Sequence, residues 1–190
     1  MANLDFITPQ LATGGDLAAH NETAIHDLAE WQRLGITHII DNRLECSDEG
    51  FVAGHAPEID YLHNGVDDAG QRMPDRWFDS GVSFTQQALR ISGAKALVHC
   101  HMGINRGPSL AYAVLLAEGW DPIDAIDAIR SARPIAAMGY AEDALAWHHR
   151  RTGVPSTTRA SDRRRMRAWR TANEIDVVRI IREVRANETV

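Results

Sequence analysis

The chain has 190 residues, 44% of them apolar, and a formal net charge of −6. This composition excludes a disordered chain and suits one compact domain with an extension. The acidic charge argues against general nucleic-acid affinity, and two cysteines are too few for a disulfide scaffold, so a reducing compartment fits best. Because the N-terminus has no signal-peptide pattern and no apolar stretch reaches about 18 residues, we expect a cytoplasmic protein without a membrane partner.

Apolar patterns and turn residues divide the chain into short strands and amphipathic helices. In chain order we predict strands at 5–8 and 11–13, a helix at 23–34, strands at 36–40 and 59–62, a helix at 75–92, a strand at 96–99, and helices at 109–118, 121–132 and 140–150. Polar loops are predicted at 41–58 and 64–74. This alternation predicts an α/β fold, with a twisted, mostly parallel central sheet flanked by helices and a C-terminal helical extension.

The C-terminal part of the chain differs from the rest in composition. We predict a compact domain at 1–151, a linker rich in Thr, Ser, Gly and Pro at 152–161, and an amphipathic helical tail at 162–190. The apolar residues of the tail share one helical face, with members Met166, Trp169, Val177, Ile180 and Val184. We expect this face to pack on the domain or to mediate self-association. Residues 159–190 hold nine Arg against five acidic residues, so the tail could contact the acidic domain or an anionic partner.

The most informative segment, at 98–109, is a short strand, then Cys100, five residues, Arg106 and a helix start. Five residues can curl so that successive backbone N–H groups face one anion, and the following helix adds the positive end of its dipole. Arg106 can bind two phosphate oxygens at once, which Lys cannot. Gly103 permits a turn that a side chain would obstruct. The predicted phosphate-binding residues are therefore His101, Met102, Gly103, Ile104, Asn105 and Arg106.

The same donors would stabilise a negative charge on the sulfur of Cys100. A free cysteine has a pKa of about 8.5, and helix N-termini and cations lower it to roughly 3.5–7.5. We therefore expect a thiolate at neutral pH, placed to attack a bound phosphate monoester in line and to form a phosphocysteine. Nothing in this chemistry requires a metal or another cofactor.

The sequence His99-Cys100-x-x-Gly103-x-x-Arg106 resembles the signature of cysteine-based protein tyrosine phosphatases, and residues 7–151 are most similar to their dual-specificity branch. The segment 11–15 resembles the opening strand and turn of that branch, and 125–134 resembles its helix and Arg-Pro segment. The resemblance implies a phosphatase with the α/β fold predicted above.

The resemblance also implies a general-acid Asp on a loop upstream of the cysteine, which protonates the leaving oxygen. In relatives this acid lies nine residues before an aromatic-Phe pair. Trp77-Phe78 fits this pair and points to Asp68, with Asp67 as the alternative. His99 is expected to orient the loop through hydrogen bonds.

One position departs from the family pattern. Relatives have Ser or Thr directly after the Arg, where the hydroxyl helps the thiolate leave, whereas this chain has Gly107. Ser109 lies two residues further on, inside the predicted helix. We therefore hypothesise that hydrolysis of the phosphoenzyme is slow.

Several substrates remain open from the sequence. The first hypothesis is a protein phosphatase acting on phosphotyrosine, with phosphoserine and phosphothreonine as further candidates. The lack of Lys between Cys100 and Arg106 disfavours polyphosphoinositides, whereas Gly103-x-Asn105-Arg106 resembles RNA 5′-triphosphatases of the same superfamily. Gly107 raises the alternative of a phosphate-binding adaptor without turnover.

Overall fold

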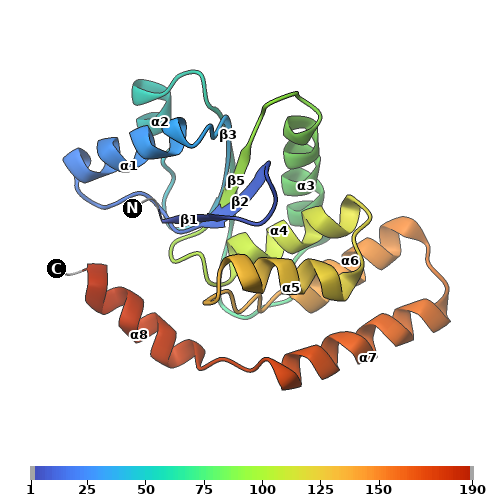
Figure 1. The fold of residues 1–190 in the computed structure, drawn as a ribbon. Coiled ribbons are helices and arrows are strands. Elements are labelled where there is room, and N and C mark those ends of the chain that lie inside the picture. The colour runs from blue at the N-terminus through green and yellow to red at the C-terminus, as the bar shows by residue number, and fades with distance from the viewer. Residues whose placement is uncertain (1–2, 189–190) are drawn as a thin grey trace.

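The computed structural model describes residues 3–188, which form a five-stranded sheet between two layers of helices (Figure 1). The strands are β1 (Leu4–Phe6), β2 (Leu11–Gly14), β3 (His38–Arg43), β4 (Asp60–Val66) and β5 (Ala96–His99). Their order in the sheet is β1-β2-β5-β3-β4. Only the β1–β2 pair is antiparallel, so β5 is a central strand with parallel neighbours on both sides. The predicted α/β fold class is confirmed.

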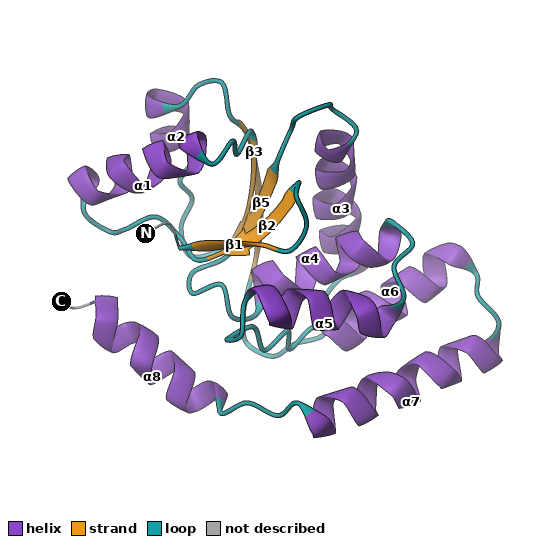
Figure 2. Cartoon of the chain, in the orientation of Figure 1, coloured by secondary structure: helices purple, strands orange, loops and turns teal. Residues whose placement is uncertain are grey.

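Helices cover both faces of the sheet, and Figure 2 shows the strands enclosed between them. The helices are α1 (Asn21–Arg33), α2 (Glu49–His55), α3 (Asp75–Leu89), α4 (Arg106–Ala117), α5 (Pro122–Ala132), α6 (Ala141–Thr152), α7 (Ser156–Ala172) and α8 (Val177–Glu188). Side chains alternate along a strand, so Ile39 of β3 packs with α1 and α2 while Ile40 packs with the helices of the opposite face. Both faces of β3 and β5 are therefore buried, as expected for a parallel sheet.

The prediction of one continuous polar loop at 41–58 was wrong, because 41–43 belong to β3 and 49–55 form α2, and only 44–48 and 56–58 are loop. β3 continues through Asp41, Asn42 and Arg43, whose polar side chains are buried and paired with one another and with neighbouring segments. α2 then forms around the buried Val52. Burial of hydrogen-bonded polar residues gives no apolar signal in the sequence, which explains the error.

The C-terminal region also differs from the prediction. Helix α7 begins at Ser156, so only residues 153–155 connect it to α6, and the predicted linker at 152–161 is mostly helical. The predicted single tail helix is two helices, because the chain leaves the helical conformation at 173–176. Met166 and Trp169 of α7 are buried against the domain, whereas Val177, Ile180, Ile181 and Val184 of α8 are only half-buried.

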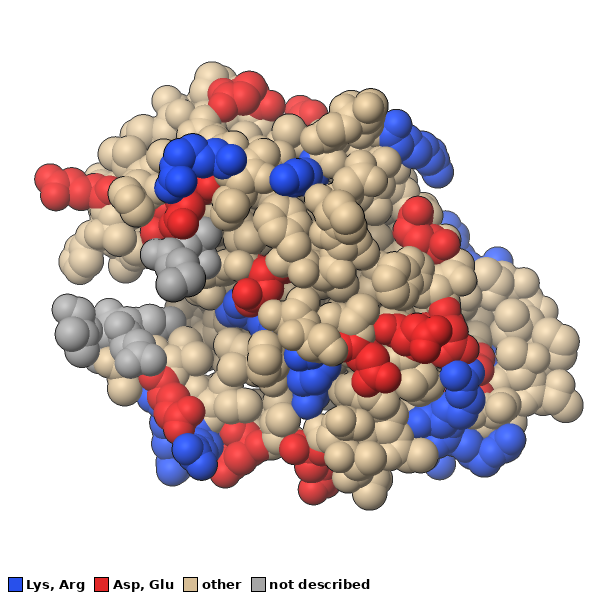
Figure 3. Space-filling model, viewed as in Figure 1, with Lys and Arg blue, Asp and Glu red and all other residues tan. Residues whose placement is uncertain are grey.

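Charged side chains of both signs are interspersed over the surface seen in Figure 3, including its lower edge, where α7 and α8 run. Arg165 of α7 binds the carboxylate of Asp121 at 2.7 and 2.8 Å. At this position the basic tail therefore contacts the acidic domain. Within the described part of the chain, no helix is long and apolar enough to span a membrane.

Candidate active site

The loop at 100–105 connects β5 to α4 at the carboxyl end of the central strand, a usual place for ligands in parallel sheets. A cavity of about 410 Å³ opens there, lined by Asp68, Cys100, His101, Met102, Ile104, Asn105, Arg106, Ala137, Gly139, Val177, Ile181 and Arg185. The fold thus brings the predicted nucleophile, general acid and phosphate-binding arginine to one cavity. Cys100 is only 3% exposed, so a phosphate must enter deeply to reach its sulfur.

The backbone of this loop has its carbonyl groups occupied and its N–H groups available. Four consecutive carbonyl oxygens, those of His101, Met102, Gly103 and Ile104, accept hydrogen bonds from Asp16, Arg133 and Ala137. By contrast, no N–H group of residues 101–105 donates to another residue in the described range 3–188. Unpaired N–H groups on such a loop are what an anion cradle requires, since in a cradle they converge on a bound oxyanion.

Gly103 is required by both conformation and space. Its φ of +64° lies in the left-handed region, which side-chain-bearing residues rarely adopt. A Cβ atom there would come within 2.5 Å of the Gly14 carbonyl carbon and 2.6 Å of Arg133 Nε. The glycine in the motif therefore allows the loop to approach β2 and Arg133 closely.

Arg133 is the main external support of the loop. Its guanidinium is 6% exposed and donates to the carbonyls of Gly103 and Met102 at 2.7 and 2.8 Å. It also donates to the carboxylate of Asp5 next to β2 at 2.7 Å. Arg133 belongs to the segment 125–134 that resembles the family, but the sequence did not predict that this arginine positions the loop.

Glu45 holds Arg106 and was missed in the sequence, where it lay in a predicted loop. Nη1 and Nη2 of Arg106 donate to the two Glu45 oxygens at 2.7 and 2.6 Å, and Nη1 also donates to the Val66 carbonyl at 3.0 Å. Nε has no hydrogen-bond partner among the described residues. The donors left over are therefore Nε–H and the second Nη2–H, on the same edge of the guanidinium, which suits a bidentate phosphate contact. The bond from Arg106 lowers the pKa of Glu45 to about 2.

Asp68 is held at the rim of the cavity by two hydrogen bonds to one oxygen. Asn105 Nδ2 and the Tyr140 hydroxyl both donate to its Oδ1 at 2.7 Å. Its other oxygen, Oδ2, lies 3.5 Å from Arg106 Nε. Burial and the bond to Asp68 raise the pKa of Tyr140 to about 12, so this hydroxyl stays a donor. Asp67 accepts a bond from the Asp68 backbone and is not among the residues that line the cavity.

The hydrogen bonds by which His99 was predicted to orient the loop are not present among the described residues. Its ring is completely buried, burial lowers its pKa, and neither ring nitrogen has a hydrogen-bond partner among the described residues. The loop is instead supported by His101, whose Nδ1 lies 2.7 Å from Asp16 Oδ2. Asp16 also binds Arg43, which pairs with the buried Asp41. This network was not predicted, because its members lie on separate segments.

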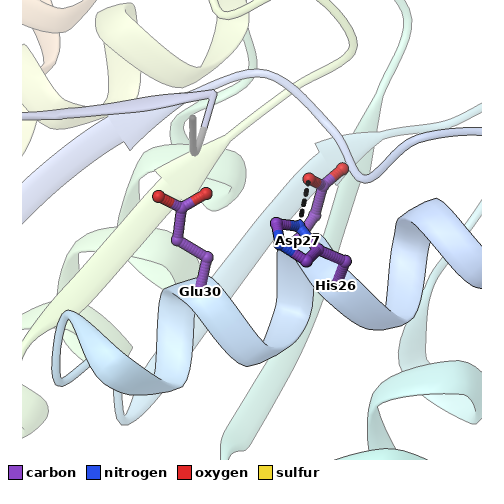
Figure 4. Close-up of side chains that lie close together, drawn as sticks. All are labelled: His26, Asp27 and Glu30. Carbon is purple, nitrogen blue, oxygen red and sulfur yellow. Dashed lines mark ion pairs between the residues drawn. The ribbon is translucent and has the colours of Figure 1, made fainter.

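Within residues 3–188, two groups of side chains place three potential metal ligands close together. His26, Asp27 and Glu30 lie along one side of α1 (Figure 4), and none of them lines the cavity. The second group is Asp41, Asp48 and His99. The Arg43 guanidinium donates to both carboxylates of this group, at 2.7 and 2.6 Å, and so already occupies the negative charge that they would offer a metal cation.

Comparisons with known proteins agree with this geometry. The family model for the dual specificity phosphatase catalytic domain matches residues 19–147. Dual specificity protein phosphatase 26 of Mus musculus is 29% identical over 151 residues, which cover 77% of this chain and 67% of that protein.

Solved structures share the fold at lower sequence identity. Human DUSP28 is 20% identical with a TM-score of 0.64, over 80% of this chain and 97% of that chain. PTPMT1 in complex with PI(5)P is 17% identical with a TM-score of 0.65, over the same shares, 80% and 97%. At these identities the likeness shows a common fold.

Proposed function

This chain belongs to the dual specificity phosphatase family, and on that premise we propose that it hydrolyses phosphate monoesters through a phosphocysteine intermediate. The observation that carries the proposal is a set of donors at the cavity that have no hydrogen-bond partner among residues 3–188: the N–H groups of 101–105 and Nε of Arg106. These donors can bind the non-bridging oxygens of a phosphate, whose phosphorus then faces the sulfur of Cys100.

In the first step the Cys100 thiolate attacks phosphorus in line. The P–S bond forms as the P–O bond to the leaving group breaks, and Asp68 gives its proton to the leaving oxygen. In the second step Asp68 accepts a proton from water, the water oxygen bonds to phosphorus, and the P–S bond breaks to release inorganic phosphate. The bonds from Asn105 and Tyr140 end on Oδ1, which supports Oδ2 as the oxygen that carries the proton.

We propose protein phosphotyrosine as the substrate, with phosphoserine and phosphothreonine as further candidates. The deep position of Cys100 favours a long, rigid phosphorylated side chain, and Met102 and Ile104 offer apolar contacts for a ring. A phosphoinositide is the second candidate, because the similar fold of PTPMT1 was solved with PI(5)P. Residues 101–105 contain no Lys or Arg, which disfavours a polyanionic head group.

We further propose that hydrolysis of the phosphoenzyme limits turnover. Gly107 offers no hydroxyl beside the loop, and Ser109 Oγ accepts a bond from the Tyr140 N–H at 3.2 Å in a fully buried position. This supports the view that Ser109 does not assist the departing thiolate. A burst of product followed by slow steady turnover is the expected kinetic signature.

The proposal is tested by hydrolysis of p-nitrophenyl phosphate without added metal, comparing wild type, Cys100→Ser, Asp68→Asn and the neighbouring Asp67→Asn. We expect no turnover from the cysteine variant, a loss of about 10²–10³-fold in kcat for Asp68→Asn, and near-normal activity for Asp67→Asn. A folded wild type that binds vanadate without turnover would favour the adaptor alternative. Turnover of phosphotyrosine, phosphoserine, phosphoinositide and 5′-triphosphorylated RNA substrates then distinguishes the substrate classes proposed for this protein.

A further inference from the structure

Helix α8 contributes to the cavity although it lies outside the segment that defines the family. The family match ends at residue 147, and α8 begins at Val177. Nevertheless Val177, Ile181 and Arg185 line the same cavity as Cys100 and Arg106. The spacing of four residues puts all three side chains on one face of the helix. Part of the cavity wall therefore comes from a segment with no assigned role.

The chain is directed to this position by contacts at the end of α7. Arg170 donates to the Met138 carbonyl at 2.9 Å, and Arg130 donates to the Asn173 carbonyl at 3.0 Å. The Met138 N–H in turn donates to the carbonyl of Ile104 in the phosphate loop. The end of α7 is thus fixed beside the loop, and α8 starts next to the cavity. Figure 1 shows α8 running from there toward the N-terminal side of the molecule.

The two sides of α8 have different surroundings. Val177 and Ile181 are half-buried, whereas Val178, between them in sequence, is 59% exposed. The cavity that remains, about 410 Å³, is within the usual range for a bound small molecule, so α8 narrows the site without filling it. Helix α8 therefore borders the cavity and does not block it.

The face of α8 also changes the charge of the cavity. Arg106 is accompanied by two carboxylates, Glu45 at 2.6 Å and Asp68 at 3.5 Å. Arg185 is a second cation among the residues that line the cavity. Its charge favours anionic substrates at the entrance, in addition to the donors of the loop.

We propose that α8 is the outer wall of the substrate pocket and selects the leaving group. Val177 and Ile181 contact the ring of an aryl phosphate, and Arg185 attracts anionic groups near the phosphate. This inference rests on the proposed phosphatase function and deepens it, because the loop then provides the chemistry and α8 the preference for large aryl substrates.

The test uses the full-length protein with Val177→Ala/Ile181→Ala and, as a matched control on the exposed side, Val178→Ala. Each is assayed with p-nitrophenyl phosphate, with the larger 4-methylumbelliferyl phosphate, and with inorganic phosphate as a competitive inhibitor. We expect KM for the larger ester to rise about tenfold in the double variant, with a smaller rise for p-nitrophenyl phosphate. The expected kcat and phosphate inhibition constant stay within twofold of wild type.

Each other result would overturn the inference. Unchanged KM for both esters would show that α8 does not contact the substrate. An equal rise in KM and in the phosphate inhibition constant would show that the double variant disturbs the phosphate-binding loop and does not simply remove a contact between α8 and the ester. Faster turnover of both esters with tighter phosphate binding would show that α8 blocks the site. Wild-type turnover in the same assay reports separately on the proposed function.

Arg185 is tested in the same way with Arg185→Gln, and Arg182→Gln serves as its control because Arg182 is on the same helix but does not line the cavity. We expect kcat/KM at low salt to fall severalfold for Arg185→Gln only, with the difference shrinking at high salt because exposed charges are screened. Equal losses in the two variants would remove Arg185 from the inference.

Discussion

The floor and the outer wall of the cavity are built in different ways. Arg106 on the floor is 4% exposed, and Arg133, which supports the loop from outside the cavity, is 6% exposed. Each donates several hydrogen bonds to separate segments. On the wall, α8 presents half-buried apolar side chains and has Val178 59% exposed on its other side.

This difference matches the two tasks that we propose for these regions. In-line attack on phosphorus needs atoms held to within fractions of an ångström, so a buried and cross-bonded floor suits the chemistry. Discrimination among leaving groups needs only complementary surface, which a less buried helix can supply and vary. Changes to the floor should therefore lower kcat or stability strongly, whereas changes to the wall should act mainly on KM.

The largest expected effect follows Arg106→Lys. A lysine cannot bind both Glu45 oxygens and a phosphate at the same time, so we expect kcat/KM for p-nitrophenyl phosphate to fall by about 10³-fold. Steady-state kinetics measure this loss. The same exchange at Arg165, in a surface pair with Asp121, is the control and should leave activity unchanged. A loss below tenfold at Arg106 would contradict the described donor arrangement.

Arg133→Met should affect stability and catalysis together. It leaves the buried carbonyls of Met102 and Gly103 without their donor, and we expect the free energy of unfolding to drop by about 2–4 kcal/mol. Urea unfolding measures the drop, and kcat should fall with it because the loop loses its shape. Arg150→Met removes the exposed pair with Asp75 and should cost less than about 1 kcal/mol. Similar losses at both sites would break the distinction between floor and surface.

The buried ion pair of Asp41 and Arg43 should make the stability of the fold depend on pH. Burial alone would raise the pKa of Asp41, but the hydrogen bonds and charge of Arg43 lower it to about 2. A carboxylate with a lowered pKa stabilises the fold above its ordinary value and loses that contribution as the pH falls toward 2. We expect on the order of 2 kcal/mol to be lost between about pH 4 and pH 2. Unfolding measured across this range should show a weaker slope in Asp41→Asn, and an identical slope would refute the assignment.

The smallest expected effect is that of Gly107→Ser. A Cβ atom there would lie 3.0–3.2 Å from backbone atoms of Val98, His99 and Cys100, so small backbone shifts are required. We expect steady turnover to rise severalfold while the burst rate is unchanged, with a stability loss of about 1 kcal/mol. Rapid-quench kinetics separate the two phases. Gly50→Ser, at an open position, controls for the added hydroxyl. Linear product formation in the wild type, without a burst, would contradict the proposal that hydrolysis of the phosphoenzyme limits turnover.

The sequence by itself determined the features that are local in the chain. The strand, Cys100, Gly103, Arg106 and the helix start follow one another within a short segment, so their spacing alone predicts the cradle. Apolar patterns of the strands and helices likewise predicted the α/β fold, because periodicity reflects which faces are buried.

Only the tertiary structure decided which remote residues complete the cavity. Glu45 and Arg106 are 61 residues apart, and Tyr140 and Asp68 are 72 apart. No spacing rule connects such positions, since contacts between distant segments depend on how the sheet order and the packing of helices bring them together. The same holds for α8, whose apolar stripe was visible in the sequence. Only Val177 of that stripe lines the cavity, where it is joined by Ile181 and Arg185. This placement follows from the bend at 173–176 and from the contacts that fix the end of α7 beside the loop.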